Sequence, residues 1–202
     1  MAFMAASAFA QEKTLVSERD FTTGEDYPYF RMEPAKADIA SFDVKDGALV
    51  IEATAPQTNM WDVQPFVLDW FNLEEGAKYE VSIDMEASAE GEYWLAMGTW
   101  NGSMPLYGLQ FAAGRQTLVN VFESCTPEAA TSGNDAHILF QCGFFVGTIK
   151  IYKVALYKVN ADRVNAVKSD NTQARLHNLV GQQVRAGYKG IVIQNGKKHI
   201  QK

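Results

Sequence analysis

Short runs of alternating hydrophobic and polar residues, separated by turn-forming residues, recur from Leu15 to Val159. The clearest run is LEEGAKYEVSIDMEA, in which Tyr79, Val81, Ile83 and Met85 alternate with charged or small polar residues. A period of two predicts a strand with one face in the core and the other in solvent. This part of the chain is therefore expected to consist of β-strands.

Other strands are predicted on either side of turn signals. SFDVKDGALVIEA has Asp46-Gly47 between two alternating runs, which is a strong hairpin signal. In NMWDVQPFVLDW, Pro65 favours a bulge or an edge strand because it lacks a backbone N–H. The remaining candidates are EYWLAMGTW, LYGLQFA, QTLVNVFES, AHILFQC and GTIKIYKVALYKV. Many short strands without helices between them predict an all-β sandwich or barrel and exclude a doubly wound sheet.

Two further hairpins are expected near the end of this region. In ILFQCGFFVGTIKIYKVALYKV, residues 138–159, a glycine-bounded turn joins two strands that are expected to close the sandwich. LVNVFESC and HILFQC are expected to pair about TSGND, which would place Cys125 and Cys142 roughly 20 Å apart at about 3.3 Å per residue. A disulfide is not expected at that distance, although an oxidising compartment would permit one.

The first ten residues, MAFMAASAFA, form a short apolar segment that ends in Ala8-Phe9-Ala10. Such a segment predicts a signal peptide over residues 1–10, and hence a secreted or cell-surface protein. Its basic start is missing, which fits a truncated signal, and a buried N-terminal helix is the alternative. No apolar run in the sequence is long enough to predict a transmembrane helix.

After Val159 the pattern changes. Residues 160–173 are polar with little periodicity and predict a linker, so the sandwich is expected to occupy residues 11–159. Residues 174–202 contain short strand-like pieces and an Asn195-Gly196 turn signal, which together predict a short β-rich tail. About 30 residues bury little on their own, so this tail is expected to dock, oligomerise or remain mobile.

Composition narrows the possible functions. Hydrophobic residues make up 47% of the 202-residue chain, which is enough for a substantial core. The formal charge of -6 argues against nucleic acid as a partner, since phosphate contacts need clustered Lys and Arg. The three histidines (137, 177 and 199) are scattered, and no Cys–His spacing indicates a zinc site. The chain contains no G-x-S-x-G, H-E-x-x-H or Gly-rich phosphate loop.

Three segments of the body carry a resemblance to a known family. They are LVSERDF as the opening strand, WDVQPFVLDWFNLEEGAKYEVSIDMEA with its Trp-x-x-Gln strand and Gly76–Tyr79 turn, and AHILFQCGFFVGTIKIYKVALYKV at the end. In these segments the body resembles carbohydrate-binding modules of the family 4/9 (CenC-like) type. The resemblance implies a jelly-roll β-sandwich that binds a polysaccharide or oligosaccharide without cleaving it. It also implies a glycoside hydrolase that acts nearby.

That family often holds a structural calcium with one acid after the opening Phe and another in the closing strand. The matching positions here are Thr22 and either Tyr152 or Lys153, none of which supplies a carboxylate. Glu25 and Asp26 are acids that could compensate for the missing carboxylates. We therefore expect no metal or cofactor.

The tail gives a second resemblance. HNLVGQQVRAGYKGIVIQNGKKHIQK, within residues 174–202, is similar to the C-terminal segments of exported glycan-utilisation proteins and to reduced type IX secretion sorting domains. The resemblance implies export and surface delivery.

Candidate sugar-binding residues are the tryptophans and nearby amides. In EYWLAMGTW, alternation places Trp94 and Trp100 on one face with small residues between them, which would leave a shallow floor for a sugar ring. Burial of both rings in the core is the alternative. Tyr107 is expected to form a wall of this site.

Alternation also places Gln141 away from the predicted core, and it places Gln64 on the face opposite Trp61. Both amides can donate and accept hydrogen bonds, although solvated surface positions would explain them equally well. The residues expected to bind carbohydrate are Trp61, Gln64, Trp94, Trp100, Tyr107, His137 and Gln141.

Two other functions remain open at this point. A structural or adhesive surface sandwich would share the fold and lack a glycan site. A small jelly-roll glycanase or lyase would need a carboxylate pair, for which Asp84 and Glu86 are the candidates, about 7 Å apart on one strand face. A solvated face explains this pair better, so no catalytic residue is expected.

Overall fold

The structure is a computed structural model that describes residues 11–24, 35–160, 176–178, 183–184, 189–194 and 197–201. The chain divides into two compact units, Met1–Asp162 and Arg163–Lys202. The expected signal peptide, most of the expected linker, and Glu25 and Asp26 lie outside the described residues.

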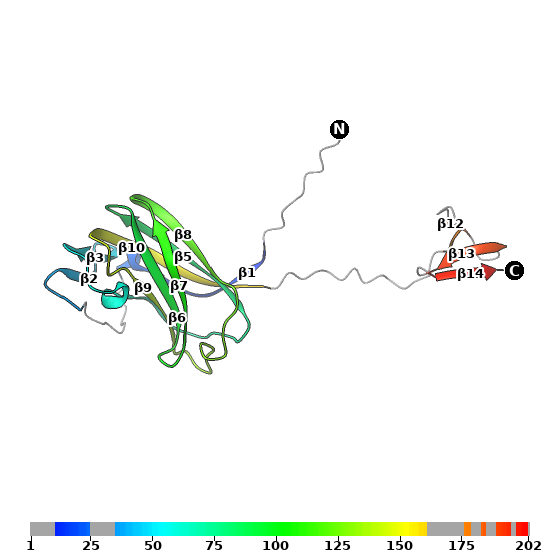
Figure 1. The fold of residues 1–202 in the computed structure, drawn as a ribbon, viewed down its shortest axis with the longest axis horizontal. Helices are drawn as coiled ribbons and strands as arrows, with labels where there is room; N and C mark the ends of the chain where they lie inside the picture. Colours follow the sequence, from blue (N-terminus) through cyan, green and yellow to red (C-terminus); the bar gives the residue numbers. More distant parts are fainter. Residues whose placement is uncertain are drawn as a thin grey trace, which may run out of the picture. The chain divides into compact units, whose positions relative to one another are not determined.

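The larger unit is a β-sandwich, as the sequence predicts (Figure 1). Its first sheet contains β1 (Lys13–Asp20), β2 (Ala40–Lys45), β3 (Ala48–Ala53), β5 (Lys78–Ala87), β8 (Gly114–Phe122) and β10 (Gly147–Val159). The strand order is β2-β3-β10-β5-β8, and β1 also pairs with β10. The long β10 reaches both neighbours on one side, because its first half pairs with β3 and its second half with β1.

The second sheet has four strands in the order β4-β9-β6-β7. These strands are β4 (Phe66–Phe71), β6 (Gly91–Gly98), β7 (Ser103–Phe111) and β9 (Ala136–Gln141). Two short 3₁₀ turns, η1 (Phe21–Thr23) and η2 (Met60–Asp62), are the helical elements among the described residues. Neither is long and apolar enough to cross a membrane.

Local sequence signals account for several elements directly. The β2–β3 hairpin turns through Asp46 and Gly47, both at positive φ (53° and 72°), with Lys45 paired to Ala48. Asp and Gly tolerate this backbone, which explains why Asp-Gly predicts the turn. In β5 the side chains of Tyr79, Val81, Ile83 and Met85 are all buried, as their alternation predicts.

The core lies between the inner faces of the two sheets. Tyr93 of β6 stacks on Phe140 of β9 with ring centroids 5.0 Å apart. Its hydroxyl donates to Asn120 Oδ1 of β8 at 2.9 Å, which links the two sheets. Burial raises the pKa of the Tyr93 phenol, because the core disfavours its charged form.

The two late hairpins expected from the sequence are wrong. β8 lies in the six-stranded sheet and β9 in the four-stranded sheet, and β10 lies in the six-stranded sheet again. Each turn therefore crosses between the sheets, because turn residues permit a reversal without fixing which strand the chain then pairs with. Cys125 and Cys142 are buried free thiols, and burial raises the pKa of Cys142 to about 12.

The smaller unit is a four-stranded antiparallel sheet in the order β12-β11-β13-β14. Its strands are β11 (Leu176–Asn178), β12 (Gln183–Val184), β13 (Gly190–Gln194) and β14 (Lys197–Gln201). Gln194 pairs with Lys197 across the expected Asn195-Gly196 turn.

Candidate functional site

The outer face of the four-stranded sheet carries most of the exposed aromatic side chains of the body. Ile138 and Phe140 of β9 enter the core, so His137, Leu139 and Gln141 lie on the outer face. A small buried cluster of Phe66, Ala96 and Leu139 lies apart from the main core. This cluster gives the outer face an apolar floor, and we refer to the whole surface as the aromatic face.

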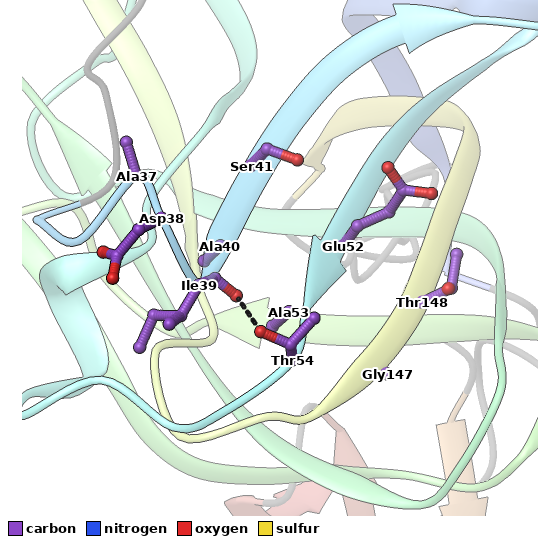
Figure 2. Close-up of a pocket in the computed structure, with 10 residues that line it drawn as sticks. All are labelled: Ala37, Asp38, Ile39, Ala40, Ser41, Glu52, Ala53, Thr54, Gly147 and Thr148. Carbon is purple, nitrogen blue, oxygen red and sulfur yellow. Dashed lines mark hydrogen bonds between the residues drawn. The ribbon is translucent and has the colours of Figure 1, made fainter.

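A hollow of about 420 Å³ elsewhere lacks this aromatic character (Figure 2). It lies at the ends of β2, β3 and β10. The hydroxyl of Thr54 donates there to the Ile39 carbonyl at 3.2 Å, so this polar group already has a partner. Its described lining residues include no aromatic side chain on which a flat ligand would stack.

One hollow on the aromatic face, which we call the aromatic groove, has a volume of about 470 Å³. Its lining residues are Trp61, Gln64, Trp94, Ala96, Ser103, Pro105, Tyr107 and Gln141. Five of the seven residues predicted to bind carbohydrate are among them.

Three aromatic rings form the groove. The Trp61 and Trp94 ring centroids are 6.2 Å apart with the planes tilted by 46°, and Tyr107 meets Trp94 edge-on at 4.8 Å. The Trp94 indole N–H donates to Glu92 Oε1 at 2.7 Å, which fixes the ring. Trp61 is 49% exposed and Tyr107 is 63% exposed, so both present apolar surface to a ligand.

Two amides complete the groove. Gln141 Nε2 donates to Gln64 Oε1 at 3.0 Å, which sets the orientation of both side chains. An amide can form up to four hydrogen bonds, so this contact leaves capacity for ligand hydroxyls.

The position of Trp61 differs from the sequence expectation, which placed it opposite Gln64. Residues 60–62 form the η2 turn rather than an extended strand, and Asp62 Oδ2 accepts from Asn59 N–H at 2.8 Å. Gly143 N–H donates to Met60 O at 2.7 Å. A Cβ on Gly143 would lie 2.1 Å from Asn59 O, so this close approach requires glycine. The turn places Trp61 and Gln64 in the same groove.

Trp100 also differs from its expected position. β6 ends at Gly98, and Trp100 lies in the following turn rather than beside Trp94 on the strand. Its ring is 5.7 Å from Phe66 and 5.0 Å from His137, measured between centroids. The structure therefore separates Trp100 and His137 from the other five predicted residues.

Trp100 and His137 belong to a second hollow of about 240 Å³, which we call the tryptophan pocket. Its lining residues are Phe66, Asp69, Trp70, Trp100, Asp135, Ala136 and His137. Sequence reasoning missed the contributions of Phe66, Asp69 and Trp70. Simple alternation along FVLDWF assigns Phe66 and Trp70 to the same face as the buried Leu68, but two register irregularities in β4 break that pattern.

Charged groups lie beneath this pocket. Asp69 of β4 forms a buried ion pair with Arg19 of β1, which joins the two sheets. Burial raises the pKa of Asp69, and the Arg19 charge opposes this shift. Burial also lowers the pKa of His137, while Asp135 and Asp69 favour its protonated form.

The candidate catalytic carboxylates lie on the other sheet and have partners. Asp84 accepts two hydrogen bonds from Arg115, at 2.9 and 2.6 Å, and Glu86 accepts one from the Tyr152 hydroxyl at 2.8 Å. The Arg115 guanidinium also lies over the Tyr152 ring, 3.5 Å from its centroid. These contacts are typical of a solvated sheet face.

The residues at the family's calcium position do not fit a calcium ion. Thr22 donates to Asp20 through its backbone N–H and its hydroxyl, and these bonds lower the pKa of Asp20. The Lys153 ammonium lies 3.0 Å from Glu18 Oε2. In the pairing of β1 with β10, Lys153 lies opposite Asp20. Thr22, Tyr152 and Lys153 supply no carboxylate, and the Lys153 ammonium adds a positive charge that disfavours a second cation beside Glu18. Among the described residues, no three His, Cys, Asp or Glu side chains are grouped to hold a metal.

Comparison with known proteins relates this fold to carbohydrate-binding modules. The CBM1 module of BiXyn10A, in its apo form, is similar with a TM-score of 0.61 and 22% identity, over 73% of this chain and 99% of that one. The second N-terminal cellulose-binding domain of β-1,4-glucanase C from Cellulomonas fimi is similar with a TM-score of 0.49 and 15% identity, over 61% of this chain and 83% of that one. The CBM22-1 xylan-binding domain of Xyn10C from Paenibacillus barcinonensis has a TM-score of 0.42 and 8% identity, over 76% of this chain and 99% of that one.

No model of a protein family matches the chain, and no curated protein matches it. The likeness to the first of these structures establishes the fold: the body is a jelly-roll β-sandwich of the kind found in carbohydrate-binding modules.

Proposed function

We propose that this protein binds a polysaccharide or oligosaccharide in the aromatic groove and does not cleave it. The observation that carries the proposal is the meeting of Trp61, Trp94 and Tyr107 with the Gln64–Gln141 amide pair in one hollow. The resemblance of the sequence to family 4/9 modules and the jelly-roll fold support the same function.

The chemistry of the groove suits a sugar ring. A pyranose has apolar C–H faces, which pack on the electron-rich faces of aromatic rings. Its hydroxyl groups both donate and accept hydrogen bonds, as the two amides do. Exposed aromatic rings held in place by the fold bind with a small loss of side-chain entropy.

The arrangement supports binding rather than hydrolysis. Glycoside hydrolysis uses two carboxyl groups on either side of the scissile bond. The described lining residues of the groove include no carboxylate, and Asp84 and Glu86 are engaged by Arg115 and Tyr152 on the other sheet.

The test is isothermal calorimetry and affinity electrophoresis of the intact chain against β-glucan, xylan, mannan and pectin. We expect binding to at least one of these polymers, with no release of reducing sugar. Tyr107→Ala should weaken binding, whereas the matched control Phe144→Ala should not, since Phe144 is an exposed aromatic outside both hollows. Absence of binding to every polymer would overturn the proposal, and release of reducing sugar would favour the enzyme.

The proposal includes export. Residues 1–10 would direct secretion, residues 160–173 would link the two units, and residues 174–202 would act as the sorting segment that delivers the module to the surface near a glycoside hydrolase. Fractionation of cells that express the full chain, or the chain without residues 174–202, tests this. Equal surface recovery of both chains would contradict a sorting role.

A further inference from the structure

Trp70 has a backbone conformation that is costly for a tryptophan. Its φ is 61°, in the left-handed region, and the register of β4 on β9 shifts between Asp69 and Phe71. A bulky L-residue is an outlier in this region, and such strain tends to persist where a ligand site benefits from it. Here the ring is 67% exposed, so packing of the Trp70 side chain itself does not explain the strain.

The strained residue lies at the tryptophan pocket. Trp100, which is 64% exposed, lines the same hollow, and Phe66 and His137 lie 5.0 Å apart within it, measured between ring centroids. A concave apolar hollow with a few polar groups is the usual form of a small-molecule site.

Asp69 supplies a polar group at this pocket. Its side chain is only 8% exposed, and Oδ1 accepts from Arg19. Its second oxygen, Oδ2, is buried and has no hydrogen-bond partner in the described part of the protein. A buried acceptor without a partner is costly, and a ligand hydroxyl that donates to it would remove that cost.

We propose that the tryptophan pocket is a second subsite, which holds one uncharged sugar residue of the same glycan with a ring hydroxyl donating to Asp69. The ligand class follows from the lining. Asp135 carries negative charge, Arg19 cancels only part of the charge of Asp69, and no Lys or Arg is among the described lining residues, so a uronate carboxylate is repelled. This inference rests on the proposed function of the aromatic groove.

The spacing of the two hollows sets the size of the ligand. Gln141 of β9 lines the aromatic groove and His137 of the same strand lines the tryptophan pocket. Four residues along a strand correspond to about 13 Å, which exceeds the length of one sugar ring. A ligand that fills both hollows is an oligosaccharide, and affinity rises with chain length until both are occupied.

The experiment is calorimetry with a ladder of neutral oligosaccharides, from disaccharide to hexasaccharide, cut from a polymer that the protein binds, and with a uronate-bearing counterpart. Trp70→Gly removes the ring and gives the backbone a residue that adopts positive φ without strain. We expect at least about a tenfold loss of affinity for the longest oligosaccharide, and little change for the disaccharide. The midpoint of thermal unfolding should not fall, which separates a binding role from a structural one.

Asp69→Asn tests the acceptor directly. It should lower the affinity for the longest neutral oligosaccharide and raise the affinity for the uronate-bearing ligand relative to the neutral one. Since this change removes the charge of Asp69 from its ion pair with Arg19, Trp70→Gly keeps the proposal testable if Asp69→Asn does not fold. Phe144→Ala is the matched control and should bind every ligand as the unchanged protein does.

The outcomes separate the two proposals. If Trp70→Gly binds long oligosaccharides as tightly as the unchanged protein while Tyr107→Ala does not, the second subsite is wrong and the proposed function stands. Equal affinity for neutral and uronate-bearing ladders would overturn the charge selection. If the unchanged protein binds no oligosaccharide or polymer, both proposals fail.

Discussion

The two sheets share one core but have different outer faces. The six-stranded sheet is covered by ion pairs such as Lys45–Glu52, Arg115–Asp84 and Lys158–Glu74. The aromatic face of the four-stranded sheet instead carries Trp61, Trp94 and Tyr107 around an amide pair. Charges that pair with each other are satisfied by the protein and by water, whereas clustered exposed rings leave apolar surface for a ligand.

The difference does not come from the inner faces, because these pack together in one core. It comes from the residues that leave the strand pattern: Trp61 on a 3₁₀ turn, Trp70 at a register shift of β4 and Trp100 after the end of β6. These three candidate residues are therefore placed by irregular backbone, whereas Trp94, Tyr107 and Gln141 lie on the strands β6, β7 and β9.

The largest effect is expected where the two sheets are tied together by charge. Arg19→Ala or Asp69→Ala should each lower the free energy of unfolding by about 3–5 kcal/mol, because each variant breaks a buried ion pair by removing one of its two charges. The double variant Arg19→Met/Asp69→Leu should recover most of this loss. Urea denaturation measures all three. A loss below about 1 kcal/mol for the single variants would show that this buried pair behaves like the exposed pairs.

The next effect concerns binding on the aromatic face. Trp61→Ala and Tyr107→Ala should each weaken polysaccharide binding by about 2 kcal/mol, or roughly 30-fold, because both rings are exposed at the groove. Stability should change by no more than about 0.5 kcal/mol, as for other surface positions. Calorimetry and thermal unfolding of the same samples give both values. A large loss of stability with unchanged affinity would assign these rings to the structure alone.

The sequence predicts much of the regular strand structure of the two sheets. Alternation identified β5 with its four buried residues, the Asp46-Gly47 hairpin, and the split of β9 into Ile138 and Phe140 inside and Gln141 outside. These features depend on local periodicity and turn chemistry, which a single sequence contains.

The rest depends on contacts between distant segments. Trp61 shares the groove with Gln64 because η2 docks against Gly143, more than eighty residues later in the chain. Trp70 reaches the tryptophan pocket because the pairing of β4 with β9 is irregular, and alternation along FVLDWF contains no sign of this. The expected β8–β9 and β9–β10 hairpins failed for a similar reason, since turns do not specify the sheet that the next strand joins.

A smaller effect should follow from pH. Burial lowers the pKa of His137 on the aromatic face, so the folded state binds this proton less readily than the unfolded chain. Its contribution to stability is therefore complete above the ordinary pKa of about 6.5 and is lost as the pH falls below it toward the lowered value. Asp69 and Asp135 oppose this loss by favouring the protonated ring, and Arg19 partly cancels the charge of Asp69.

Urea denaturation at pH 8, 6.5 and 5.5 measures this dependence. His137→Gln should flatten the decline between pH 6.5 and 5.5, because it removes the titrating ring. If the free energy of unfolding falls with pH equally steeply in the variant and the unchanged protein, groups other than His137 cause its pH dependence.

The smallest effect is expected on the outer face of the six-stranded sheet. Asp84→Ala removes an ion pair whose two side chains are 36% and 50% exposed, so the free energy of unfolding should fall by only about 0.2–1 kcal/mol, and less at high salt. Glycan affinity should be unchanged, because neither Asp84 nor Arg115 lines a hollow of the aromatic face. Calorimetry and urea denaturation at low and high salt check both points. Loss of binding in Asp84→Ala would mean that the ion-paired face also contacts the ligand, and the division of roles between the two sheets would then be wrong.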